Sequence, residues 1–298
     1  MTGPRVGKQS GSAGPHGVVV IDKPAGWTSH DVVAKSRGVL GTRKVGHSGT
    51  LDPDATGVLV LGVGHATRLL RFLTELPKQY EGEIVLGVET STLDAAGEVT
   101  TTHDMAAVTD AEVQLAAASL TGDLMQVPPM VSAIKIDGKR LHELAREGKE
   151  VERPPRPVRV DRFDVAPVEG EPGVWRCSVD CSSGTYIRSL AADLGRALGG
   201  GAHLRSLRRT AVGGYRLTDA GSIESPNLLP VSAAVRHLAA ADVDDETAVL
   251  VGHGRILTPE QLGVTGAGPW AVCDAAGELL AVYETHPKGA KPSVVIPR

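Results

Sequence analysis

A glycine-rich turn that runs straight into apolar residues constrains this chain more than any other feature. Residues 45–68 read VGHSGTLDPDATGVLVLGVGHATR. The uncharged run at 57–64 is short, which is typical of a strand buried on both faces. Leu51 and Pro53 flank Asp52, and the proline restricts the backbone before it. We therefore expect a loop between a helix and a central strand that presents the Asp52 carboxylate in one direction.

The order of strand and helix patterns defines the fold class. A serine or threonine precedes two helical patterns, so Ser29 and Thr109 are predicted N-caps. The mixed order of the patterns predicts an α+β fold, with helices flanking a largely antiparallel mixed sheet. Strands are expected at 17–24, 57–64, 80–90, 156–168, 174–184 and within 199–217, helices at 30–40, 65–73, 109–120 and 185–199, and a strand, a turn and a helix at 132–148.

The 298 residues allow one large domain or two unequal ones. Residues 1–16 are rich in glycine, serine and proline without periodicity, and we interpret them as a disordered leader. The pattern changes near residue 217, and the tail reads as brief β-like pieces. We expect a main domain at 17–225 and a small, mostly β domain at 226–298.

Composition excludes several classes of protein. The net charge of −4 is not that of a polycation, and no apolar run is long enough to span a bilayer. The leader also lacks the apolar core of a secretion signal, so we expect a cytoplasmic protein without a membrane. Cys177 and Cys181 have no further ligand at metal-binding spacing, so they are expected to be buried thiols and no metal site is predicted.

Asp52 is the first candidate for chemistry. A turn aspartate that caps the next element is the plainer interpretation. As a lone carboxylate it would otherwise serve as a nucleophile or an electrostatic group. His47 is interpreted as a neutral hydrogen-bonding imidazole rather than a base. The glycines match neither a P-loop nor a dinucleotide fingerprint.

Basic and aromatic residues supply the other candidates. Arg188 is expected near the start of a helix, where it either pairs with a buried carboxylate or lies on the surface. Tyr80 either stacks on a base or packs at the edge of the core. Six arginines against one aspartate at 188–216 suggest a local phosphate-binding face, although such runs are by default solvated.

Six motifs in order resemble the bacterial tRNA pseudouridine synthase B family. They cover roughly residues 17–217 and read VIDKPAGWTSHDVV, GHSGTLDPDATGVLVLGVGHATR, KQYEGEIVLG, VPPMVSAIKIDGKRLHELAREG, CSSGTYIRSLAADLG and GAHLRSLRRTAVGGY. The resemblance implies the pseudouridine synthase fold with a C-terminal PUA-like RNA-binding domain. It also implies isomerisation of uridine 55 in the T loop of elongator tRNAs by base flipping, without metal or cofactor.

The resemblance also implies a role for individual residues. Asp52 corresponds to the catalytic aspartate, Tyr80 to the aromatic that stacks on the target base, and Arg188 to the partner of Asp52. The implied substrate-binding residues are His47, Tyr186, Leu207, Arg205, Arg208, Arg209 and Lys23. The implied partner is the tRNA T stem-loop, and we expect a monomer. Ser48 and Asp54 depart from the usual residues of the motif.

Three other functions compete with this interpretation. An RNA-binding module without catalysis would have no need for Asp52 beside Arg188. The subunit of a guide-RNA-dependent synthase would carry a clearer PUA domain and lysine-rich extensions. A nucleoside glycosidase that uses an aspartate would lack the RNA-binding arginines and would release free uracil.

Overall fold

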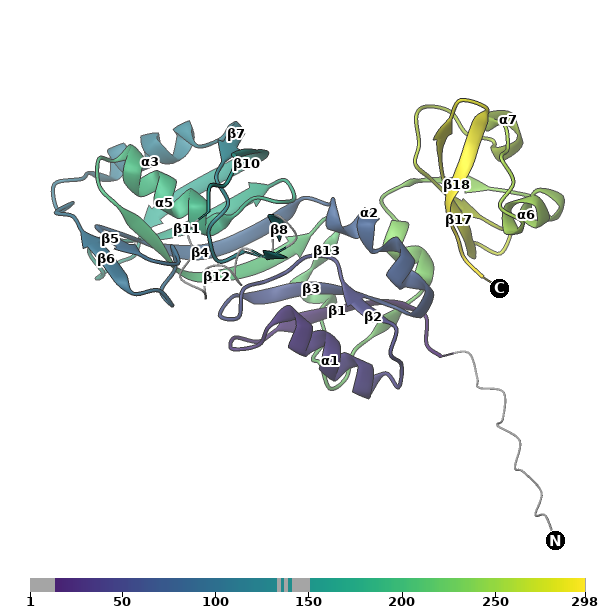
Figure 1. Ribbon diagram of the computed structural model, residues 1–298, viewed down its shortest axis with the longest axis horizontal. Coiled ribbons are helices and arrows are strands. Elements are labelled where there is room, and N and C mark those ends of the chain that lie inside the picture. The colour runs from purple at the N-terminus through teal and green to yellow at the C-terminus, as the bar shows by residue number, and fades with distance from the viewer. Residues whose placement is uncertain (1–13, 133–134, 137–138, 141–150, 298) are drawn as a thin grey trace, which may run out of the picture.

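The computed structural model describes residues 14–132, 135–136, 139–140 and 151–297. A ten-stranded mixed sheet forms its main body (Figure 1). Neighbouring strands are antiparallel except β3 and β12, which run parallel, and the predicted α+β class is confirmed. In spatial order the path is β14 (Leu228–Leu229), β1 (Gly17–Lys23), β3 (Thr56–Val63), β12 (Ala202–Val212), β4 (Lys78–Leu86), β11 (Val174–Cys181), β10 (Arg156–Pro167) and β7 (Gly122–Gln126), with β2 (Val45–His47) beside β3 and β13 (Tyr215–Arg216) beside β12.

The helices cover the sheet in two groups. Helices α3 (Asp110–Ser119) and α5 (Ile187–Ala197) pack together over β10 and β12. Helix α1 (Ser29–Val39) lies beside β2. The predicted 65–73 helix begins as the 3₁₀ turn η1 (Gly64–Leu69) and continues as α2 (Leu70–Thr74). Apolar side chains of β1 and β3 form one buried cluster with η1 and α2, and those of β11 and α5 form another.

The predicted caps differ in outcome. Thr109 caps α3 in a capping box with Glu112, as expected. Helix α1 is capped by Thr28 rather than Ser29, because Thr28 forms a capping box with Asp31. The Ser29 hydroxyl is instead hydrogen-bonded to the backbone of Leu51, so the expected cap contributes to the Asp52 loop.

Two short hairpins complete the main body, β5 (Val88–Thr90) with β6 (Val99–Thr102) and β8 (Lys135–Ile136) with β9 (Lys139–Arg140). The latter pair flanks the turn predicted within 132–148. The turn itself and the helix expected after it lie outside the described residues. Cys177 and Cys181 are buried free thiols as predicted, whereas Cys273 is only partly buried.

The last strands form a separate small sheet (Figure 1). Before it, η2 (Leu217–Asp219), β14 and η3 (Val231–Val235) stay with the main body, where β14 pairs with β1. None of the described helices is long and apolar enough to cross a membrane. The small sheet contains β15 (Ala239–Asp242), β16 (Trp270–Cys273), β17 (Leu279–His286) and β18 (Gly289–Val295), with α6 (Asp245–Gly252) and α7 (Pro259–Leu262) beside it.

Candidate active site

The loop before β3 is held from three directions. Ser29 of α1 accepts a hydrogen bond from the Leu51 amide at 2.9 Å and donates to the Leu51 carbonyl. Lys23, at the end of β1, is fully buried and donates to the carbonyl of Pro53 at 2.8 Å. Arg209 of β12 donates to the carbonyls of Gly49 and Thr50. These bonds bracket Asp52 on both sides and fix its direction.

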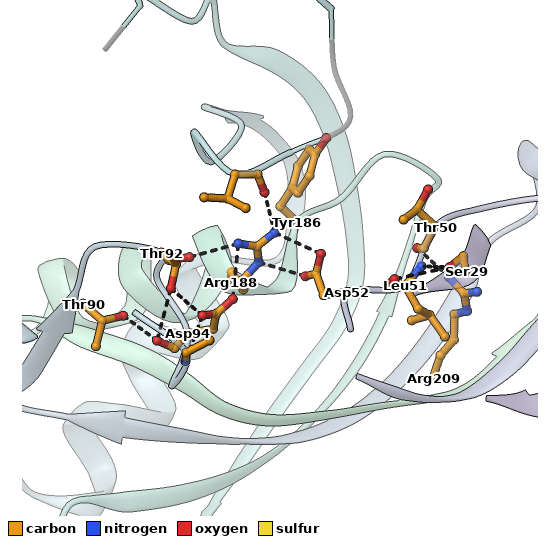
Figure 2. A network of polar contacts seen from close by, with 12 residues as sticks. Ser29, Thr50, Leu51, Asp52, Thr90, Thr92, Asp94, Tyr186, Arg188 and Arg209 are labelled. Carbon is orange, nitrogen blue, oxygen red and sulfur yellow. Dashed lines mark hydrogen bonds and ion pairs between the residues drawn. The ribbon is translucent and has the colours of Figure 1, made fainter. Parts of the chain in front are cut away.

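Asp52 forms a two-point ion pair with Arg188 in the first turn of α5 (Figure 2). The Nε to Oδ2 distance is 2.9 Å and the Nη2 to Oδ1 distance is 3.2 Å. Such a fork holds a carboxylate by geometry as well as charge. The structure thus brings together two residues that lie 136 positions apart in the chain.

All the donors of the Arg188 guanidinium have acceptors. Besides Asp52, Nη2 donates to the Val131 carbonyl at 2.8 Å and Nη1 to the Thr92 carbonyl at 3.0 Å. Nη1 also lies 3.3 Å from Oδ2 of Asp94. The Arg188 side chain is only 4 % exposed. A buried guanidinium with every donor satisfied cannot turn away, so Asp52 has a rigid partner.

Asp94 is a component of the site that sequence reasoning missed. Its Oδ1 accepts a hydrogen bond from the Thr92 hydroxyl and another from the Ala96 amide, and Thr90 donates to its carbonyl (Figure 2). Its only signal was membership of the acidic stretch at 75–123, which contains many other carboxylates. A bridge between Asp94 and Leu204 of β12 brings it to the site.

Opposing influences act on the Asp52 carboxyl. Burial raises its pKa, and the negative charge of Asp94 raises it further. The positive charges of Arg188 and Lys23 lower it, but the net direction is upward. Arg188 is therefore the strongest of the influences that favour the ionised form of this carboxylate.

A cavity of about 370 Å³ opens beside the ion pair. Tyr80 of β4 and Tyr186 at the start of α5 line it together with Leu207 of β12. Burial raises the pKa of both tyrosines, so their hydroxyls are protonated near neutral pH. The cavity thus combines two aromatic residues with one carboxylate, and its volume is large enough to admit a planar ring.

Gln126, the last residue of β7, positions one of these tyrosines. Its side-chain oxygen accepts from the Tyr186 amide at 2.7 Å, and its nitrogen donates to the Tyr186 carbonyl at 3.0 Å. Tyr186 is the N-cap of α5 and has no side-chain cap of its own. Gln126 therefore replaces a cap and sets the start of the helix that carries Arg188.

His47 and Lys23 lie behind the loop. Burial and the charges of His30 and Arg209 lower the pKa of His47 to about 4, so its imidazole is neutral at pH 7. Its Nδ1 accepts from the Gly49 amide at 3.3 Å. The Lys23 ammonium is occupied by three carbonyls, those of Pro24, Trp27 and Pro53. Lys23 thus contacts the loop backbone from inside the protein.

The arginines of β12 make their described contacts within the protein. Arg205 pairs with Glu83 and Glu171, and Arg208 with Asp22 at 2.7 Å. Arg209 is 2 % exposed, and its third contact is the Val58 carbonyl at 2.7 Å. Sequence reasoning treated all three as phosphate ligands because it could not see these partners. Among the described residues, no three acidic, histidine or cysteine side chains gather as metal ligands would.

Family models match nearly the whole chain. The N-terminal domain of the TruB family pseudouridylate synthases matches residues 37–187. The tRNA pseudouridylate synthase B C-terminal domain matches 188–242, and the C-terminal model of tRNA pseudouridine synthase II matches 238–297.

Known proteins agree with these models. A tRNA pseudouridine synthase B from Streptomyces coelicolor is 50% identical over 290 residues, covering 93% of this chain and 96% of its own, and one from Corynebacterium aurimucosum is 49% identical, covering 91% and 93%. Among solved structures, the Cbf5-Nop10-Gar1 complex aligns with a TM-score of 0.73 and 26% identity, covering 95% of this chain and 85% of the matched chain. Because its first family model covers half of the sequence and these relatives cover nine-tenths of it, the chain belongs to the TruB family of pseudouridylate synthases.

Proposed function

We propose that the protein isomerises uridine 55 in the T loop of elongator tRNAs to pseudouridine, with Asp52 as the reacting carboxylate. One observation carries this proposal: the fixed Asp52–Arg188 pair stands at the edge of a cavity that two tyrosines line. The names of the relatives supply the substrate, tRNA. The motifs of the chain supply the position in the T loop.

The reaction requires a carboxylate and little else. The bond between N1 and C1′ breaks, the uracil turns within the site, and C5 bonds to C1′ before its proton leaves. Asp52 either attacks the sugar or the ring or assists formation of a glycal, and each route needs it ionised. Arg188 keeps it ionised and aimed once bound RNA excludes water.

The cavity accounts for recognition of the base. A uridine inside a folded T loop reaches Asp52 only after it flips out, at a cost of a few kcal/mol. The ring of Tyr80 then stacks on the uracil, with Tyr186 and Leu207 enclosing it. We assign His47 to the space that the flipped base leaves, because its neutral imidazole carries no charge to repel or attract the loop.

Other residues support the site from behind. Lys23 and Arg209 hold the backbone of the Asp52 loop, so we propose a positioning role for both rather than contact with phosphates. Contact of Arg205 and Arg208 with the RNA backbone stays a prediction, and it requires that each exchange a carboxylate for a phosphate. The small C-terminal sheet is proposed as a PUA-like RNA-binding domain of a monomeric enzyme.

The test compares the wild type with Asp52→Asn on an unmodified tRNA transcript tritiated at C5 of the uridines. We expect the wild type to release tritium from uridine 55, and the variant to bind equally but to release it about 10⁴-fold more slowly or not at all. Asp54→Asn, which removes an exposed carboxylate of the same loop, is the matched control and keeps its activity. Binding without release by the wild type favours a non-catalytic RNA-binding module, and free uracil among the products favours a glycosidase.

A further inference from the structure

Two buried cations lie together at the cavity beside Asp52. Lys78 begins β4, and Arg209 of β12 pairs with Tyr80 two residues further along β4. Both cations line the cavity that contains Tyr80. Lys78 is 6 % exposed and Arg209 2 %. Because side chains two apart in a strand share a face, Lys78 and Tyr80 extend from the same side of β4. The wall of the cavity therefore carries positive charge directly next to the aromatic ring.

The two cations differ in how their donors are used. Arg209 bonds to two loop carbonyls and to the Val58 carbonyl of β3, so its donors are used within the protein. The ammonium of Lys78 has three donors, and the described contacts satisfy one of them, with the carbonyl of Thr74. Within the described part of the chain no carboxylate lies within ion-pair distance of Lys78. Lys78 thus has hydrogen-bonding capacity in reserve.

A buried ammonium without a counter-ion is unfavourable. Burial and the neighbouring charge of Arg209 lower the pKa of Lys78 to about 8. An anion in the cavity would relieve both effects. Asp52 does not fill this role, because Arg188 already binds its carboxylate at the other side of the site. The cavity is accordingly prepared for a negative charge that the ligand itself supplies.

We propose that Lys78 binds the uracil ring in the cavity and stabilises the negative charge that the ring gains when the bond from N1 to C1′ breaks. This inference rests on the proposed function. The electron pair of the breaking bond passes to the uracil and is shared between its nitrogen and carbonyl oxygens, which accept hydrogen bonds from the ammonium. No proton leaves Lys78. The proton later lost from C5 passes to solvent, and N1 takes up a proton from solvent, so the product is neutral. A preorganised cation at this place lowers the barrier because it acts only as the charge develops.

Burial decides between the ring and an RNA phosphate. A phosphate belongs to the continuous backbone and stays near the mouth of the cavity, whereas only the flipped base enters it. Lys78 is buried, as are the core residues on either side of it in the sheet, Cys181 and Val212. A side chain at that depth meets the base.

The experiment measures single-turnover tritium release and tRNA affinity for Lys78→Met and Lys78→Arg. Lys78→Met keeps the apolar stem and removes the charge, so we expect release to slow about 10²-fold with unchanged affinity. Lys78→Arg keeps the charge, so it restores part of the rate. The wild-type rate is expected to fall as the pH rises through about 8, and the Arg variant to lose that decline, because its guanidinium stays charged.

The controls separate the possible failures. Lys35→Met removes an exposed lysine of α1 and leaves the rate unchanged. If Lys78→Met loses affinity and its salt dependence weakens by about one charge, the ligand is a phosphate and the inference is wrong. A wild-type rate in Lys78→Met also overturns it, while the proposed function stands. Only failure of the wild type to release tritium overturns both. If Lys78→Met does not fold, the pH profiles of the wild type and Lys78→Arg decide alone.

Discussion

Arginine–carboxylate pairs occur both at the active site and at the junction with the small sheet, but their surroundings differ. Arg188 is 4 % exposed and has a fixed acceptor for every donor. Arg71 of α2 pairs with Glu284 of β17 at 2.6 Å, and their side chains are 50 % and 44 % exposed. Water can replace either partner in the second pair, whereas in the first it reaches Asp52, which is 42 % exposed, but not Arg188. The comparison teaches that the same chemical contact can be indispensable or nearly neutral, depending on what else would solvate its ends.

The largest effect is expected from Arg188→Leu. Its removal leaves Asp52 and Asp94 facing each other without a cation, so we expect unfolding free energy to fall by about 2–4 kcal/mol, discounted for the partial exposure of both carboxylates. Tritium release should disappear. Because both carboxyls then gain protons more easily, the loss of stability should shrink between pH 7 and pH 5. Urea unfolding of the wild type and Arg188→Leu at pH 7 and pH 5 measures this loss of stability.

A loss that does not depend on pH would contradict this explanation. It would mean that the apolar contacts of the arginine stem, rather than the stranded carboxylates, cause the destabilisation. Arg188→Lys is the control, because it keeps one charge but not the fork. It should recover part of the stability and little of the activity.

A smaller effect is expected from His47, a partly buried histidine of the same region. The pKa of His47 is about 4 in the folded protein and near 6.5 when unfolded, so the unfolded chain binds more protons between these values. Stability therefore falls as the pH falls from about 6.5 to about 4, by about 1–2 kcal/mol from this group once the roughly 3 kcal/mol that the shift implies is discounted for the partial exposure of the ring. Comparing unfolding curves of the wild type and His47→Gln across this pH range isolates the contribution of His47 to the free energy of unfolding. Identical slopes for the two proteins would show that His47 is solvated more than its burial indicates.

The smallest effect is expected at the junction. Arg71→Ala should change the free energy of unfolding by less than about 1 kcal/mol. In an exposed pair, water stabilises the separate arginine and glutamate nearly as well as they stabilise each other. Even that change should vanish in 1 M salt. Glu284→Ala should behave in the same way. A loss above 2 kcal/mol from either would break the comparison and assign the pair a structural role.

The sequence predicted the elements around Asp52 well, since strand and helix periodicity is local. The N-cap was misplaced by one residue because Thr28 and Ser29 are equally suitable types, and only the geometry with Asp31 distinguishes them. The proximity of Asp52 and Arg188 followed from the resemblance to a family. From composition alone, Arg188 would have remained a helix residue with two interpretations.

What the sequence did not reveal depends on register between distant strands. Asp94 and Gln126 reach the site through contacts with residues 94 and 60 positions away. In the sequence, Lys78 resembles any lysine at the start of a strand. Only the pairing of β4 with β12 shows that it lines the cavity together with Arg209. The internal contacts of the β12 arginines were hidden for the same reason, because pairing of β12 with β4 supplies Glu83 to Arg205 and buries Arg209.

The attachment of the Asp52 loop also has a consequence for synthesis of the chain. Two of its supports, Lys23 and Ser29, are made before the loop, but Arg209 is made 160 residues after Gly49. Contacts at such separation form late, because the intervening chain must first be ordered. A nascent chain that has not yet exposed β12 therefore carries every residue of the Asp52 motif without an organised site. Competence for the reaction is acquired only once the second half of the large sheet has left the ribosome.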